Sequence, residues 1–158
     1  MKKLLIGGMV AASMFAMQLS QAAIICDVKA SLDEARAKLV EMIKTGDKAA
    51  RGEGTLRNKV DSATAKLEEA YTAMLGDDDN ADDAKLGTFK ETWEAFKKTR
   101  EEEIMPALAA GDTDKAKGIA GGVQKERLGI MNGVVKELGG DKCEKEENLS
   151  RKSFEIFF

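Results

Sequence analysis

Residues 56–74 read LRNKVDSATAKLEEAYTAM. The apolar and small residues of this stretch recur at steps of three and four: Leu56, Val60, Ala63, Leu67, Ala70 and Met74. This spacing places them along one face of an α-helix, because residues three and four apart lie above one another. Charged and polar residues fill the other positions, so the pattern predicts a helix with one buried and one solvated face.

Three further stretches repeat this spacing, with Lys, Glu and Asp between their apolar members. The stripes are Val28, Leu32, Ala35, Leu39 and Met42; Leu86, Phe89, Trp93 and Phe96, continuing past Pro106 to Leu108; and Ala116, Ile119, Val123, Ile130, Val134 and Leu138. Turn-forming segments separate the four stretches at 51–55, 76–83 and 110–113. Short connections make neighbouring helices antiparallel. The sequence therefore predicts an all-α fold, an antiparallel up-down-up-down four-helix bundle.

The N-terminus has the composition of a secretory signal. Two lysines precede an apolar run from Leu4 to Met17, and the small residues Ser20 and Ala22 follow. This order predicts a signal peptide over residues 1–22, cleaved after Ala22 or one residue later, and a periplasmic location. We expect the four-helix bundle to occupy residues 23–143, and residues 144–158 to form a polar, flexible tail.

Two alternatives to a cleaved signal remain. Ile24 and Ile25 lengthen the apolar stretch towards the length of a membrane anchor, although polar residues between 18 and 21 interrupt it. Cys26 is close enough to the signal to suggest a lipoprotein, but Ile25 is bulkier than the residue expected before a lipidated cysteine. We therefore expect contact with the membrane only if the signal segment is uncleaved.

The two cysteines, Cys26 and Cys143, lie at opposite ends of the predicted bundle sequence. In an up-down-up-down bundle, the start of the first helix and the end of the fourth lie at the same end of the molecule. An exported protein meets an oxidising compartment, where such a pair usually forms a disulfide. We therefore expect a Cys26–Cys143 bridge.

Composition excludes several classes of function. The net charge is −3 and the chain contains no basic block, so nothing indicates nucleic-acid binding. Histidine is absent, which removes the commonest general base and the commonest zinc and haem ligand. The acidic segment 77–83 lacks the glycine and glutamate spacing of an EF-hand loop, so we interpret it as a solvated linker. We expect no metal, no cofactor and no enzymatic activity.

Two arginines fall where the apolar stripes would otherwise continue. Arg100 follows Phe96 by four residues, and Arg127 follows Val123 by four. Charged side chains are rarely buried unless they are paired. One interpretation is that the two arginines clamp a small anionic ligand between facing helices. The other is that they pair with Glu103, Glu126 or Glu41, or extend their charged ends to water.

The second half of the chain carries motifs of a known family. They are Trp93-x-x-Phe96-x-x-x-Arg100, Glu103-Ile104-x-Pro106-Ala107, Ala110-Gly111-Asp112, Lys115-Ala116-Lys117 and Gly122-Val123-Gln124-x-Glu126-Arg127. In these residues the chain resembles the four-helix-bundle ligand-binding domain of methyl-accepting chemotaxis receptors. The sequence departs from such receptors after the fourth helix, where no second membrane helix or signalling module follows. The resemblance then implies a free-standing bundle or a fragment of a longer receptor.

The resemblance also implies a function and a site. Domains of this kind commonly dimerise and bind small solutes through arginines on the bundle helices. By motif position, Arg100, Gln124 and Arg127 are the candidate ligand-binding residues. We therefore expect a sensor-like or solute-binding bundle that recognises a small anionic ligand. The alternative is a structural or stress-related periplasmic bundle that acts through protein–protein contacts and binds no small ligand.

Overall fold

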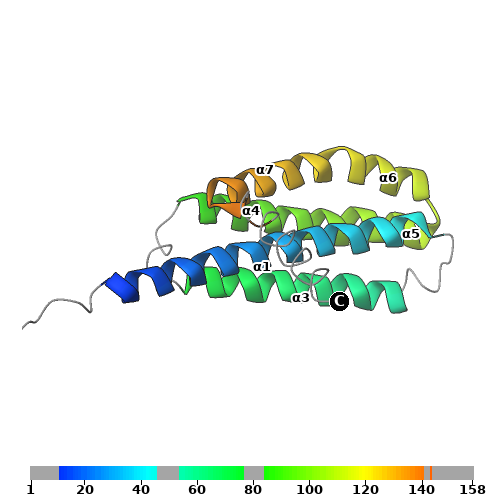
Figure 1. The fold of residues 1–158 in the computed structure, drawn as a ribbon. Helices are drawn as coiled ribbons and strands as arrows, with labels where there is room; N and C mark the ends of the chain where they lie inside the picture. The colour runs from blue at the N-terminus through cyan, green and yellow to red at the C-terminus, as the bar shows by residue number, and fades with distance from the viewer. Residues whose placement is uncertain (1–10, 46–53, 77–83, 141–142, 144–158) are drawn as a thin grey trace, which may run out of the picture.

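A computed structural model of the protein describes residues 11–45, 54–76, 84–140 and 143, and for residues 11–22 it describes only the helical backbone. Four long helical rods lie side by side with alternating direction (Figure 1). The described residues contain no strand. The predicted all-α, antiparallel four-helix bundle is therefore confirmed. The acidic segment 77–83, the tail 144–158 and residues 1–10 of the predicted signal lie outside the described residues.

The first two rods are single helices, and the last two are interrupted. α1 spans Ala11–Lys44 and α3 spans Thr55–Leu75. The third rod consists of α4 (Ala84–Thr99), a π-helical turn η1 (Arg100–Ile104) and α5 (Met105–Ala110). The fourth consists of α6 (Thr113–Gly121) and α7 (Val123–Glu137). α1 continues through residue 22, so the helix is unbroken across the predicted cleavage site.

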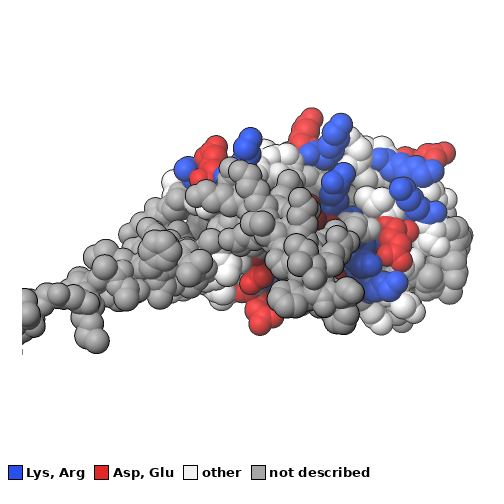
Figure 2. Space-filling model, in the orientation of Figure 1, with Lys and Arg blue, Asp and Glu red and all other residues white. Residues whose placement is uncertain are grey.

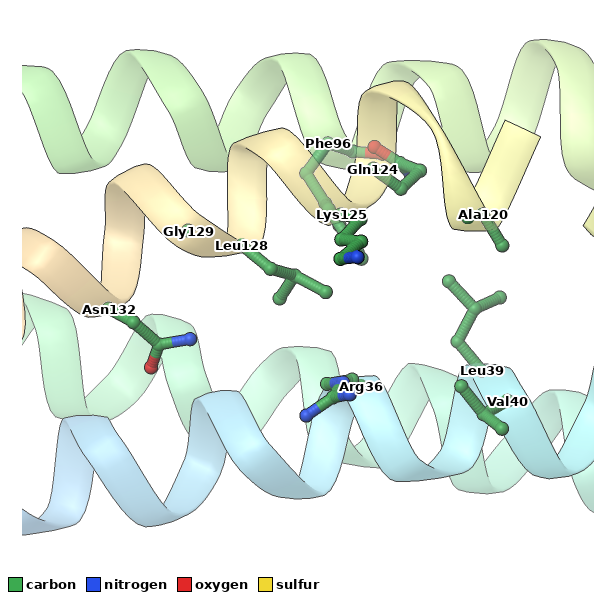
Figure 3. A pocket seen from close by; sticks show the side chains of 11 residues that line it. Arg36, Leu39, Val40, Phe96, Ala120, Gln124, Lys125, Leu128, Gly129 and Asn132 are labelled. Atoms are coloured by element: carbon green, nitrogen blue, oxygen red, sulfur yellow. The ribbon is translucent and has the colours of Figure 1, made fainter. Parts of the chain in front are cut away.

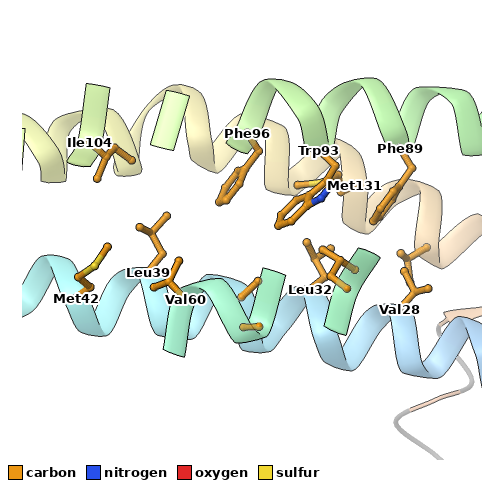
Figure 4. Close-up of a cluster of buried hydrophobic side chains, with 14 of the residues drawn as sticks. Val28, Leu32, Leu39, Met42, Val60, Phe89, Trp93, Phe96, Ile104 and Met131 are labelled. Atoms are coloured by element: carbon orange, nitrogen blue, oxygen red, sulfur yellow. The ribbon is translucent and has the colours of Figure 1, made fainter. Parts of the chain in front are cut away.

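The rods bury the predicted apolar stripes in one core. Figure 4 shows Leu32, Leu39 and Val60 on the α1 and α3 side facing Phe89, Trp93 and Phe96 of α4. The aromatic rings of α4 are almost fully buried, and those of Trp93 and Phe96 stack with centroids 5.5 Å apart. Burial of such large apolar surfaces supplies the main stabilisation of the fold. The stripes of the first three rods are thus core, as their spacing predicts.

The outer surface carries both signs of charge. Figure 2 shows basic and acidic side chains interspersed on the face in view. Some of them link neighbouring rods: Lys66 of α3 lies 3.0 Å from Glu34 of α1, and Lys59 lies 3.2 Å from Glu41. Exposed pairs of this kind contribute little to stability, because water screens them and ordering the long side chains costs entropy.

Pro106 explains the π turn in the third rod. A proline has no backbone N–H, and its ring clashes with the carbonyl four residues before it, here that of Glu102. In the structure the backbone N–H of Met105 donates to the carbonyl of Arg100, five residues back, so the helix widens for one turn. The rod then ends at Gly111, whose φ of 82° is readily adopted only by glycine. Asp112 caps the next helix through a 3.0 Å bond from the N–H of Lys115.

The fourth rod differs from its predicted register. Val123 and Ile130, both assigned to the core stripe, are 39% and 48% exposed. Gln124, Met131 and Val135 are buried in their place. The reason is a break at Gly122, whose φ and ψ of −95° and −111° are not helical, so α7 restarts with its inward face moved by one residue. The prediction for this stripe is therefore wrong at Val123 and Ile130, whereas Val134 is buried as predicted.

A disulfide joins Cys26 of α1 to Cys143 beyond the end of α7, with Cα atoms 5.3 Å apart. The predicted pairing is confirmed, and with it the prediction that the two cysteines lie at one end of the bundle. Within the described ranges, no helix is both long and apolar enough to span a membrane. The same ranges contain no group of three acidic or cysteine side chains arranged to hold a metal ion.

Candidate ligand-binding cavity

The rods are not equally close to one another. α1 packs mainly on α3, and α4 mainly on α7, whereas α1 makes less contact with α6 and α7. A half-open cavity of about 460 Å³ lies along this looser seam (Figure 3). Small-molecule sites commonly have volumes of this order. The residues that line it are Arg36, Leu39 and Val40 of α1, Phe96 of α4, Ala120 and Gly121 of α6, and Gln124, Lys125, Leu128, Gly129 and Asn132 of α7.

The cavity combines an apolar interior with a cationic rim. Leu39 and Phe96 are buried, and Val40 and Leu128 extend the apolar wall. Arg36 and Lys125 are exposed and line the cavity from opposite helices (Figure 3). None of the lining residues is acidic. In the part of the chain that the structure describes, neither cation forms an ion pair or a hydrogen bond.

The helix that carries Lys125 adds to this positive field. Lys125 lies in the first turn of α7, which begins at Val123. The aligned peptide dipoles give the N-terminal end of a helix a partial positive charge. An anionic group placed between Arg36 and Lys125 would therefore meet two full charges and one partial charge of the same sign.

Gln124 forms the polar part of the cavity floor. Its side chain is 1% exposed, and both ends of its amide are bonded. Nε2 donates a 2.9 Å hydrogen bond to the backbone carbonyl of Phe96, and Oε1 accepts one of 3.1 Å from Nη1 of Arg127. A buried amide satisfied in this way contributes to the rigidity of the floor. Of the three predicted site residues, Gln124 alone lines the cavity.

Arg127 lies one turn beyond Gln124 and is partly buried. Besides its bond to Gln124, Nη1 donates a 2.7 Å hydrogen bond to Oγ1 of Thr99 on α4. The side chain therefore ties α7 to α4. The predicted alternative partner, Glu126, forms no bond with it among the described residues.

Arg100 points from η1 towards α3 and is 4% exposed. Nε donates to Oε1 of Glu101 at 2.7 Å, and Nη1 donates to Oγ1 of Thr64 at 2.7 Å. Oε2 of Glu101 also accepts a 2.8 Å bond from Nη1 of Arg57 on α3. The alternative prediction of an internal carboxylate partner is correct in kind but wrong in the residue, because the partner is Glu101 rather than Glu103, Glu126 or Glu41.

The remaining predicted partner, Glu41, is bound elsewhere. Hydrogen bonds from Lys59 and Lys38 hold the pKa of its carboxyl group below the usual range. The structure thus places Arg100, Arg127 and Gln124 in internal bonds, and neither Arg100 nor Arg127 lines the cavity.

Sequence reasoning missed Arg36 and Lys125. Arg36 is adjacent to Ala35 in the first stripe, and Lys125 is adjacent to Gln124, so both flank an inward face instead of interrupting it. Such cations are common on bundle helices. Arg36 and Lys125 differ from other such cations only because α1 and α7 are separated at this point, and the periodicity of the sequence does not encode that separation.

A model described as a four helix bundle sensory module for signal transduction matches residues 10–151, which is most of the chain. Comparisons with curated proteins and with solved structures found no match. Modules of this family are typically periplasmic sensor domains of membrane receptors and in general are not enzymes. The chain belongs to the family of four-helix-bundle sensory modules for signal transduction.

Proposed function

We propose that this chain is an exported sensory bundle that binds a small anionic solute in the cavity between α1 and α7. Arg36 and Lys125 contact the anionic group, and Leu39, Val40, Phe96 and Leu128 contact an apolar part of the ligand. The observation that carries the proposal is that Arg36 and Lys125, which have no ion pair or hydrogen bond within the described residues, lie over a largely apolar cavity with no carboxylate among its lining residues. Charge-assisted hydrogen bonds to carboxylate or phosphate are among the stronger polar contacts in proteins.

In this proposal Arg100, Gln124 and Arg127 have supporting positions. Gln124 shapes the floor, and the arginines fix α7 and α3 to the third rod through Thr99 and Thr64. An arginine already bonded within the protein would have to release those bonds before it could bind a solute. Arg36 and Lys125 form no such bonds with the described residues, which is why we assign the anion contacts to them.

A thermal-shift screen of the purified bundle tests the proposal. The panel contains acetate, hexanoate, benzoate, succinate, inorganic phosphate, the neutral amides of the monocarboxylates and matched alkylammonium ions. A ligand at a hundred times its dissociation constant stabilises the protein by about 2.7 kcal/mol. Anions should raise the melting temperature, and their neutral and cationic analogues should not. Stabilisation by the cations instead, or by no compound, contradicts the proposal.

A second candidate function is a bundle that acts through protein contacts without a small ligand, including contacts between two copies of this chain. The exposed side chains of Val123 and Ile130 on α7 favour it, because large apolar residues usually lie inside. Sedimentation of the wild type and of a Val123→Ser, Ile130→Ser variant distinguishes the two. A wild-type dimer that the double substitution dissociates supports the contact function, whereas a monomer in both cases opposes self-association through this face.

A further inference from the structure

We propose that the π turn η1 is the element that responds to occupancy of the cavity, through hydrogen bonds from Gln124 and Arg127 to the end of α4. This inference rests on the proposed function and concerns how binding at that site is transmitted. The cavity floor is hydrogen-bonded to the last turn of α4, directly before the π turn: Gln124 and Phe96 both line the cavity, and the Gln124 amide binds the carbonyl of Phe96.

The first link runs from the floor to the backbone of α4. In Figure 3 the side chain of Gln124 lies beside Phe96, and both line the cavity. Nε2 of Gln124 donates to the carbonyl oxygen of Phe96 at 2.9 Å. In a regular α-helix that carbonyl would accept from the N–H four residues later, which is that of Arg100, the first residue of η1. Gln124 therefore bonds to the last regular turn before the helix widens.

The second link runs through Arg127. Nη1 donates to Oε1 of Gln124 at 3.1 Å and to Oγ1 of Thr99 at 2.7 Å. Thr99 is 6% exposed and immediately precedes η1. A shift of the Gln124 amide thus removes the bond to the Phe96 carbonyl and also frees Arg127 on one side, so that Arg127 is held only by Thr99, directly before the π turn.

On the opposite side, the π turn is held to α3. Nη1 of Arg100 donates to Oγ1 of Thr64 at 2.7 Å, and the Glu101 carboxylate binds Arg57. Pro106 removes the donor that a regular helix would offer to the carbonyl of Glu102. The turn therefore lies between two sets of side-chain bonds, at the point where the backbone bonds of the rod are least regular. Such π turns frequently occur at functional sites.

The fourth rod has a joint next to this linkage. Gly122 breaks the helix between α6 and α7, two residues before Gln124. The first turn of α7 can therefore move relative to α6 without bending a continuous helix. A ligand that contacts Lys125 acts on that first turn and, through it, on the neighbouring Gln124.

The test places an occupant in the cavity covalently, so it does not depend on finding a ligand. Gly129 lines the cavity, and a Cβ built there meets no atom within 4 Å. Gly129→Phe and Gly129→Leu therefore introduce side chains of two sizes at the cavity wall. Gly133→Phe and Gly133→Leu are the matched controls, because Gly133 lies one turn further along α7, has equally free space and lines no part of the cavity.

The readout is backbone hydrogen exchange at residues 100–105, including the Met105 amide that donates to Arg100. We expect both Gly129 variants to exchange faster there by about fivefold, the change expected for losing one hydrogen bond of ordinary net strength. The Gly133 variants should leave these amides unchanged. Circular dichroism checks that every variant stays folded, and the leucine pair serves if a phenylalanine variant unfolds.

A second background shows whether the effect passes through Gln124. Gln124→Met keeps the length of the side chain but removes both amide bonds, so it should by itself raise exchange at residues 100–105. Adding Gly129→Leu to it should then produce no further increase. Unchanged exchange in the Gly129 variants, an equal change in the Gly133 variants, or a full additional increase in the Gln124→Met background overturns the inference. If a solute binds in the thermal-shift screen but these results are negative, the proposed function stands and the transmission fails.

Discussion

Cys26 and Cys143 are 117 positions apart in the sequence, and their Cα atoms are 5.3 Å apart in the structure. The disulfide between them joins the first rod to the end of the last, so it closes nearly the whole bundle into one loop. Cross-linking a loop of this size restricts the unfolded chain far more than the folded one. The bond therefore acts on the stability of the entire domain.

Replacing both cysteines by serine should lower the free energy of unfolding by about 4 to 5 kcal/mol, the value that the chain-entropy model gives for a loop of about 100 residues. Urea unfolding of the wild type and of the Cys26→Ser, Cys143→Ser variant measures the difference. Adding reductant should bring the wild type to the stability of the variant and leave the variant unchanged. Equal stabilities of the two oxidised proteins would contradict the prediction.

The Arg100–Glu101 pair should respond differently to loss of each partner. Removing Glu101 as Glu101→Ala leaves the guanidinium of Arg100, whose side chain is 5% exposed, without a carboxylate and should cost about 3 kcal/mol. Arg100→Met removes the buried charge itself, while Glu101 is partly exposed and keeps Arg57, so the cost should be about 1 kcal/mol. Chemical denaturation of both variants gives the comparison. A larger loss of stability in Arg100→Met than in Glu101→Ala would contradict the prediction, because the unpaired buried charge of Arg100 would then not be the dominant cost.

The fold could be predicted from sequence because it depends on local periodicity. The stripe from Leu56 to Met74, together with the stripes of the first and third rods, determines which helix faces are buried. The antiparallel order of the four rods then places Cys26 and Cys143 at the same end of the bundle. The fourth stripe was wrong at Val123 and Ile130, because the non-helical Gly122 moved the inward face at the start of α7 from Val123 to Gln124, although Val134 is buried as predicted. Nothing in the spacing of apolar residues marks such a change.

The candidate site was less predictable than the fold. Arg100 and Arg127 were conspicuous because they interrupt stripes, and the structure satisfies both with internal partners. Arg36 and Lys125 were inconspicuous because a cation beside an apolar stripe is the ordinary pattern of a bundle helix. Their relation appears only when α1 and α7 are placed in space.

The raised pKa of Lys97 predicts that the protein loses stability at alkaline pH. Burial by itself would lower the pKa of this side chain, but hydrogen bonds to Glu68 at 2.6 Å and Glu94 at 3.0 Å outweigh burial and raise it. The pKa of Lys97 in the folded protein exceeds the unfolded value of about 10.4. The stabilisation that protonated Lys97 gives to the folded state is therefore fully present below that pH. It is lost as the pH rises through the folded pKa.

Urea unfolding between pH 8 and about pH 11.5 tests this expectation. Burial also raises the pKa of Tyr71, which should reduce stability in the same alkaline range. Lys97→Met removes the lysine contribution and retains that of Tyr71. The free energy of unfolding should therefore fall less steeply with pH in the variant than in the wild type. Identical slopes would mean that the bonds of Lys97 to Glu68 and Glu94 do not persist in solution.

Export predicts a specific mature N-terminus. If the signal is cleaved after Ala22, periplasmic material should begin at Ala23, and the remaining part of α1 contains the core residues from Ile25 to Ile43. Intact-mass analysis with and without reductant measures the cleavage site and the disulfide together. A mass that includes residues 1–22 would identify the segment as an anchor instead.

The most direct test of the cavity concerns Arg36 and Lys125. Both side chains are exposed and unpaired within the described residues, so Arg36→Ala and Lys125→Ala should each change the stability of the unliganded protein by no more than about 0.5 kcal/mol. Each should nevertheless weaken binding of a stabilising anion by about tenfold, because a charge-assisted hydrogen bond is lost. Lys136→Ala is the matched control, since Lys136 is exposed on the same helix and is not among the residues that line this cavity.

Salt dependence separates direct contact from a general effect of charge. The Debye length, over which exposed charges interact, falls from about 8 Å at physiological ionic strength to about 3 Å at 1 M salt. Binding through Arg36 and Lys125 should weaken with salt in the wild type and in Lys136→Ala, and much less in the double variant that lacks both cations. Calorimetric titration with the strongest anion from the screen measures each affinity. If Lys136→Ala weakens binding as much as Lys125→Ala, the anion responds to net charge and the cavity is not its site.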